Sequence, residues 1–179
     1  MNKPDTFVNA IEHINQLPSA ELREAVYRCC ASSRWANQMA TAAPYASIDS
    51  LHNKAVGIWS ALSNEDYLEA FKGHPMIGAD LDALRRKFTH TSEWSEGEQA
   101  GMQSASETVL KRLQTANIEY VNRFGYIFIV CATGKSASEM LSLLELRLSN
   151  PAEVEMTIAA GEQQKITTIR LNKWFEQMV

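Results

Sequence analysis

The stretch YIFIVCATGKS, Tyr126 to Ser136, interrupts a chain whose other apolar residues recur at helical spacing. Its first eight residues are rich in β-branched and aromatic types, which favour a strand. A single strand with no partner elsewhere in the chain would leave its main-chain N–H and C=O groups unmatched. We therefore predict a buried extended linker that has spare main-chain donors.

The end of this stretch, GKS, raises the alternative of a phosphate-binding loop. Such a loop needs G-x-x-x-x-G-K-[ST], and here Ile129 occupies the position of the first glycine. A β-branched residue resists the positive φ that the turn demands. Ser136 with Glu139 three residues later has the spacing of a capping box that opens a helix. A phosphoryl-transfer enzyme that uses Lys135 is thus a disfavoured alternative.

Apolar spacing of three and four residues dominates the chain on both sides of this stretch. It predicts an all-α protein, a single-domain bundle of about eight helices over residues 1–179 with the one buried extended linker. Ser63 is placed to cap a helix that ends at Gly73, where we expect a left-handed conformation. A short helix is expected around Leu81, Leu84 and Phe88, and a long helix from Ser95 to Gly125.

Composition limits the classes of partner. The 179 residues are 45% hydrophobic and carry a net charge of -4, so the chain has no general attraction to nucleic acid or to anionic lipid. Cys29 and Cys30 are adjacent and Cys131 is remote, which fits neither a disulfide framework nor a metal knuckle. The pattern indicates a reducing, cytoplasmic environment. The sequence has no apolar run that would span a membrane and no export signal.

His74 is the histidine best placed for chemistry. None of the four histidines has metal-ligand spacing, so no metal site is expected. His74 lies in KGHPMIGAD, between a helix end and Pro75, which holds the preceding residue extended. A loop histidine held in this way can donate or accept a proton near neutral pH. The alternative is a histidine that hydrogen-bonds its own turn.

SEGEQAG, Ser95 to Gly101, also allows two interpretations. Ser95 and Glu98 have the spacing of a capping box, which alone would explain both residues. Gly97 is a poor residue for a first helical turn, and Gln99 adds a second polar group. Helix N-termini favour anions, so an acidic substrate could bind there. Arg170, between Ile169 and Leu171, would be partly buried beside either a structural carboxylate or an anionic ligand.

Four motifs in this order, GHPMIGAD, SEGEQAG, RFGYIFIVCATGKSASEMLSLLELRLSN and KITTIRL, resemble the OHCU decarboxylase family. The resemblance extends from roughly Trp35 to Leu171. It implies an all-helical, cofactor-free and usually dimeric enzyme of urate breakdown. Its substrate would be the small-molecule ureide 2-oxo-4-hydroxy-4-carboxy-5-ureidoimidazoline, converted to (S)-allantoin with loss of CO2. The alternative of another class is a non-enzymatic helical protein-interaction module.

The resemblance also implies a set of site residues. The catalytic pair would be His74 and Glu98. The substrate-binding residues would be Pro75, Ser95, Glu96, Gly97, Glu98, Gln99, Phe128, Ile129, Val130, Cys131, Ala132 and Arg170. Met76 departs from the basic residue usual in bacterial members, which puts the fit of the substrate beside His74 in question.

Overall fold

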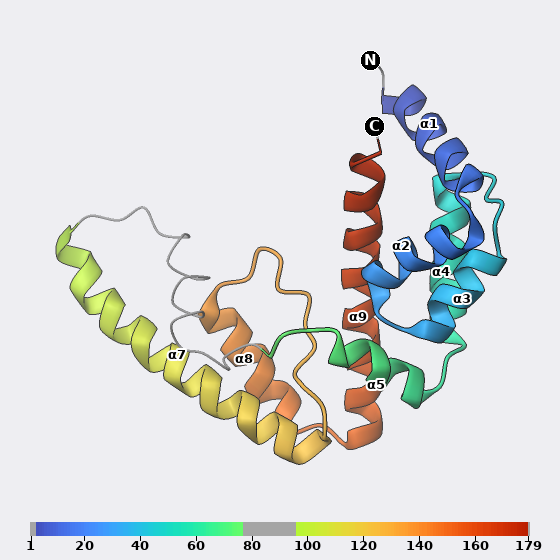
Figure 1. The fold of residues 1–179 in the computed structure, drawn as a ribbon. Helices are drawn as coiled ribbons and strands as arrows, with labels where there is room; N and C mark the ends of the chain where they lie inside the picture. Colours follow the sequence, from blue (N-terminus) through green and yellow to red (C-terminus); the bar gives the residue numbers. More distant parts are fainter. Residues whose placement is uncertain (1–2, 77–95, 179) are drawn as a thin grey trace. The chain divides into compact units, whose positions relative to one another are not determined.

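The computed structural model describes residues 3–76 and 96–178, with side chains at 10–76 and 107–178. These residues form eight helices and no strand, which confirms the all-α prediction (Figure 1). The helices are α1 (Lys3–Gln16), α2 (Ser19–Cys30), α3 (Ser33–Thr41), α4 (Ile48–Ser60), α5 (Asn64–Lys72), α7 (Glu96–Phe124), α8 (Ala137–Leu148) and α9 (Ala152–Glu176). The helix predicted at residues 81–88 lies outside the described residues. None of the described helices is long and apolar enough to cross a membrane.

The chain divides into two compact units. Unit 1 comprises Met1–Gly73 and Ala160–Val179, and unit 2 comprises His74–Ala159. Helix α9 contributes residues 152–159 to unit 2 and residues 160–176 to unit 1. The prediction of a single domain over residues 1–179 concerns how the two units assemble, and it stays a prediction.

Two tryptophans tie the helices of unit 1 together. The indole N–H of Trp35, on α3, donates to the carbonyl of Ala55, on α4, at 3.0 Å. The indole of Trp59, also on α4, donates to the carbonyl of Ala160, on α9, at 3.0 Å. Both indoles are buried, and a buried indole N–H needs such a partner. The two hydrogen bonds therefore satisfy the buried indole N–H groups and at the same time link α3, α4 and α9.

Helix α5 begins and ends where predicted, but the conformation of its C-cap residue differs from the prediction. Ser63 and Asp66 form a capping box, with the Ser63 N–H donating to the Asp66 carboxylate at 3.0 Å. The prediction that Gly73 is left-handed is wrong, since its φ is -73°. A Cβ added to Gly73 would lie 2.5 Å from the Cβ of Ala31, the residue that ends α2. Glycine is therefore required here for the close approach of two helix ends.

Unit 2 places the interrupting stretch between α7 and α8, which pack side by side (Figure 1). Gly125 ends α7 with φ +78°, and its N–H donates to the Val121 carbonyl at 2.8 Å. Residues 127–132 are neither helix nor strand, and Phe128, Ile129 and Val130 are buried, which confirms the buried linker. The capping box of Ser136 and Glu139 then opens α8.

Candidate functional site

The predicted catalytic pair falls only partly within the described residues. His74 follows the end of α5 and is half-buried, and Pro75 beside it is exposed. Glu98 lies in the first turns of α7, as do Glu96, Gly97 and Gln99, but their side chains lie outside the described part. Ser95 lies outside it altogether. The convergence of His74 and Glu98 on one ligand therefore stays a prediction.

The predicted binding segment, residues 128–132, is described in full. The Ile129 carbonyl accepts from the Arg147 guanidinium at 2.7 Å, and the Cys131 carbonyl accepts from Lys135 Nζ at 2.6 Å. Two cationic side chains thus hold main-chain oxygens at alternate positions. Among the described residues, no backbone–backbone hydrogen bond is made by residues 127–130. The segment is held by side chains.

A buried ion pair lies behind this segment. Arg147, on α8, is 6% exposed, and Glu155, in the first turns of α9, is 0% exposed. Arg147 Nε donates to Glu155 Oε1 at 2.7 Å, and Asn150 Nδ2 donates to Glu155 Oε2 at 2.8 Å. The Tyr120 hydroxyl also donates to Glu155 Oε1. All four charged or polar side chains therefore belong to one network.

The network packs against the Phe128 ring, and the pKa of its own member Tyr120 is raised. The Arg147 guanidinium lies 4.6 Å from the centroid of the Phe128 ring, a cation–π contact. The Tyr120 ring meets Phe128 edge to face at 5.3 Å. Burial, and then the hydrogen bond to Glu155, raise the pKa of the Tyr120 phenol well above its ordinary value, while Arg147 opposes the rise. The phenol is consequently a permanent donor to Glu155 at physiological pH.

Sequence reasoning did not single out Arg147 or Glu155. A signal was present, because Met140, Leu144 and Arg147 are spaced by four and three residues and all three are buried. A charged residue on the apolar stripe of a helix is expected to have a partner. The partner, Glu155, follows the break at Pro151, so helical periodicity could not connect the two.

Arg170 belongs to unit 1, where it contacts the main chain of α2 near two thiols. Its guanidinium is half-buried, and Nη1 donates to the Cys29 carbonyl at 3.3 Å. Burial raises the pKa of Cys29 to about 11 and of Cys30 to about 12, and the charge of Arg170 acts in the opposite direction on both. These two thiols are therefore protonated and unreactive near neutral pH. The prediction that Arg170 meets the other site residues remains to be tested.

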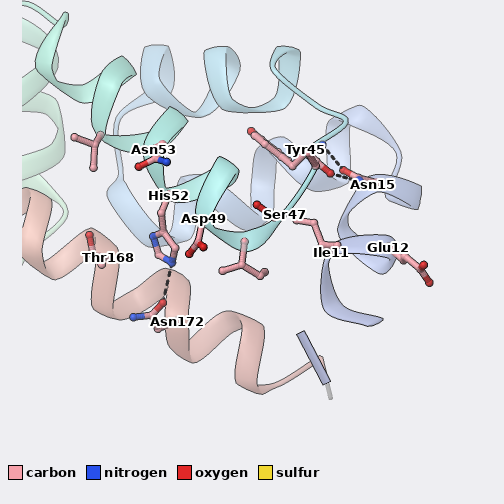
Figure 2. Close-up of a pocket in the computed structure, with 13 residues that line it drawn as sticks. Ile11, Glu12, Asn15, Tyr45, Ser47, Asp49, His52, Asn53, Thr168 and Asn172 are labelled. Atoms are coloured by element: carbon pink, nitrogen blue, oxygen red, sulfur yellow. Dashed lines mark hydrogen bonds between the residues drawn. The ribbon is translucent and has the colours of Figure 1, made fainter. Parts of the chain in front are cut away.

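Unit 1 contains a cavity of about 890 Å³ bounded by α1, α4 and α9 (Figure 2). On its wall His52 Nε2 lies 2.9 Å from Asn172 Oδ1, and Asn15 exchanges two hydrogen bonds with the main chain of Tyr45. None of the predicted site residues lines it. In the part of the chain that the structure describes, no group of three His, Cys, Asp or Glu side chains could hold a metal ion.

Comparison with known proteins identifies related sequences. The chain is 39% identical over 154 residues to the uric acid degradation bifunctional protein TTL of Arabidopsis thaliana. This match covers 82% of this chain and 45% of that protein. It is 31% identical over 130 residues to the 2-oxo-4-hydroxy-4-carboxy-5-ureidoimidazoline decarboxylase of Mus musculus, covering 72% and 71%. A bifunctional uric acid degradation protein of Bacillus subtilis is covered to 32% of its length. The chain thus spans less than half of the bifunctional relatives.

Solved structures share the fold. A crystal structure of an OHCU decarboxylase in the presence of (S)-allantoin aligns with a TM-score of 0.68 at 36% sequence identity, covering 84% of this chain and 96% of that one. A crystal structure of (S)-allantoin synthase aligns with a TM-score of 0.66 at 18% identity, which shows likeness of fold alone. Residues 15–172 match the sequence pattern of the OHCU decarboxylases, and the chain belongs to the OHCU decarboxylase family.

Proposed function

We propose that this chain decarboxylates 2-oxo-4-hydroxy-4-carboxy-5-ureidoimidazoline to (S)-allantoin in urate breakdown. The family match over residues 15–172 is the observation that carries the proposal. The likeness to a decarboxylase crystallised in the presence of (S)-allantoin supports the same product. Family membership also favours an enzyme over the non-enzymatic interaction module.

The substrate brings its own electron sink, so the proposed reaction needs no cofactor. The carbon that loses CO2 bears a hydroxyl and adjoins a ring C=N bond. When the carbon–carboxylate bond breaks, its electron pair moves toward that C=N bond and the ring nitrogen takes up a proton. The hydroxyl then loses its proton as it becomes a carbonyl, and the neighbouring carbon takes up a proton. The protein has to orient the ring, accept the hydroxyl proton and deliver a proton to one face.

Two side chains would perform the proton transfers. Glu98 accepts a hydrogen bond or proton from the substrate hydroxyl, and His74 donates the proton that sets the S configuration. A positioned acid or base contributes about 10²- to 10⁴-fold to a rate. Because the substrate also decays unaided, control of the product's configuration is the larger benefit.

The remaining groups would bind the ring. Main-chain N–H and C=O groups of residues 128–132 match the amide and ureido edges of the substrate, which explains why the side chains there are apolar. Arg170 would hold an anionic or carbonyl oxygen through its planar fork. Ser95 to Gln99 and Pro75 complete the proposed pocket, with Met76 beside His74.

The proposal extends to the assembly and the compartment. The resemblance implies a homodimer, the cysteine pattern indicates the cytoplasm, and the net charge of -4 disfavours binding to nucleic acid or to an anionic membrane. Sedimentation velocity measures the assembly directly, and a purified protein that sediments only as a 20.0 kDa monomer would contradict the dimer.

The experiment that tests the function generates the substrate in place from urate with the two upstream enzymes. The optical activity of the allantoin is then followed with and without this protein. We expect an excess of the S enantiomer that grows with protein concentration. Racemic allantoin at every protein concentration would refute the proposed function.

A further inference from the structure

The contacts of Arg147 point beyond a structural role. Its guanidinium bonds to Glu155 Oε1 through Nε at 2.7 Å and to the Ile129 carbonyl through Nη1 at 2.7 Å. The planar guanidinium presents these donors in a fixed fork, so the carboxylate on one side determines where the carbonyl on the other side lies. Glu155 is itself held by Asn150 and Tyr120. The position of the Ile129 carbonyl is thereby set by a network of buried charges.

The fixed carbonyl also determines which main-chain groups remain available. In an elongated chain the N–H and C=O groups of alternate residues point to the same edge. Ile129 and Cys131 use their carbonyls on Arg147 and Lys135. Within the described part of the chain, the main-chain groups of Phe128 and Val130 make no hydrogen bond. By this alternation, the main-chain donors and acceptors of Phe128 and Val130 would lie on the edge opposite the carbonyls of Ile129 and Cys131.

We propose that Arg147, held by Glu155, is a positioning residue that fixes residues 127–132 so that the main chain of Phe128 and Val130 binds the amide and ureido edges of the substrate. This inference rests on the proposed function for the identity of the ligand. It adds Arg147 and Glu155 to the machinery of the site without contact between either side chain and the reacting atoms.

A purely structural ion pair makes a different prediction. Replacing a buried ion pair by apolar residues of similar volume is often neutral for stability, whereas removing one partner alone leaves an unpaired buried charge. The double variant Arg147→Met/Glu155→Leu therefore separates the two roles. If the pair is only structural, the double variant should bind the ligand as the wild type does. If the pair positions the segment, the double variant should fold but no longer hold residues 127–132 in place.

The first arm measures ligand binding and turnover. Binding of (S)-allantoin is followed by calorimetry, and KM and kcat are measured with substrate generated from urate. For the double variant we expect a KM and an allantoin Kd raised roughly 10- to 100-fold, the range for loss of a hydrogen bond to a charged group, with kcat within about threefold. Arg147→Lys, which keeps the charge but lacks the fork, should weaken binding in the same direction.

The second arm measures the segment without any ligand. Amide hydrogen exchange in a peptide covering residues 127–132 should become about tenfold faster in the double variant, while α7 and α8 keep their protection. The matched control is Arg112→Met/Glu145→Leu. Arg112, on α7, contacts Glu145, on α8, at 2.8 Å and so also joins two helices, but both side chains are about 40% exposed or more. This control should leave KM, Kd and exchange at residues 127–132 unchanged.

Each outcome decides the proposal. Wild-type KM and Kd in a folded double variant would overturn the positioning role. Wild-type binding of allantoin by Arg147→Lys would overturn it as well. If the wild-type protein neither binds allantoin nor enriches the S enantiomer, the proposed function fails. The hydrogen-exchange experiment still tests whether Arg147 and Glu155 hold residues 127–132. Unchanged exchange at these residues in the double variant would refute that positioning role.

Discussion

Gly73→Ala tests whether the close approach at the end of α5 is real. Gly73 precedes His74 directly, so the start of the predicted catalytic loop depends on where α5 ends. An added Cβ would lie 2.5 Å from the Ala31 Cβ and 3.2 Å from the Ala70 carbonyl oxygen. Carbon atoms pack best at about 3.5–4.0 Å, so the first contact cannot persist. The φ of -73° suits alanine, which leaves the clash as the source of any loss.

The magnitude follows from two opposing effects. Overpacking of a rigid site costs about 1–3 kcal/mol. Replacing glycine by alanine recovers about 0.4–1 kcal/mol, because the unfolded chain has less conformational freedom. We expect Gly73→Ala to lower the free energy of unfolding by about 1–2 kcal/mol, which is roughly 2–8 °C in Tm for a chain of this size.

Ala31→Gly provides the second corner of a double-mutant cycle. Ala31 ends α2 in the left-handed conformation, with φ 63° and ψ 24°. That conformation costs an L-residue about 1–2 kcal/mol, partly offset by the unfolded-state entropy of glycine, so the single variant should gain about 0.5–1 kcal/mol. Ala31→Gly also removes the atom that Gly73→Ala would strike. In this background Gly73→Ala should cost close to nothing, a coupling of about 1–2 kcal/mol.

The assay is urea unfolding of the four proteins, followed by circular dichroism. Gly57→Ala is the matched control, since an added Cβ there meets nothing within 4 Å and the residue lies inside α4. It should stabilise the protein by about 0.5–1 kcal/mol. Additive effects of Ala31→Gly and Gly73→Ala, within about 0.3–0.5 kcal/mol, would refute the close approach.

Four further predictions follow from the site and the helix ends. His74→Ala should abolish the excess of (S)-allantoin and preserve the helical circular dichroism spectrum; unchanged enantioselective turnover would remove His74 from the mechanism. Glu98→Gln should lower turnover about 10²- to 10⁴-fold although glutamine can still close a capping box, and retained activity would favour the structural interpretation. Ser136→Ala should cost about 1 kcal/mol in urea unfolding, since it opens the box at the start of α8, and a loss below about 0.3 kcal/mol would contradict that. Burial raises the pKa of Tyr45 to about 12 and of Cys30 to about 12, so their contribution to stability is complete below the unfolded values of 10.0 and 9.0 and falls as pH rises toward 12. Tm should therefore decline above about pH 9, and Tyr45→Phe should flatten the decline between about pH 10 and 12.

Local chemistry explains which parts of the fold were predictable. The cap at Ser63 and the capping box of Ser136 and Glu139 were predicted because each depends on residues within one turn of the chain. The buried linker at residues 127–132 was predicted because its composition contrasts with the helical spacing around it. Contacts between distant residues were not predictable in this way. The reason for Gly73 lies at Ala31, which no local pattern reveals.

The candidate site shows the same division. Its linker residues were predicted from the sequence together with the family resemblance, whereas the Arg147–Glu155 pair was not. A buried ion pair can be predicted only when both partners are known to meet. Here the end of α8 and Pro151 lie between Arg147 and Glu155, which is in the first turns of the next helix. His74 and Glu98 belong to unit 2 and Arg170 belongs to unit 1. The variants His74→Ala and Glu98→Gln test the roles predicted for the first two.

The three thiols differ in burial, so a label can be placed at one position of the unmodified protein. Cys29 and Cys30 are buried and protonated near neutral pH, while Cys131 is half-buried within the proposed binding segment. A maleimide or a thiol-reactive fluorophore applied near pH 7 should consequently modify position 131 alone, with no cysteine added or removed. A dye attached there would register ligand occupancy in real time, and shielding of the thiol by bound ureide would give the dissociation constant of a compound too short-lived for calorimetry.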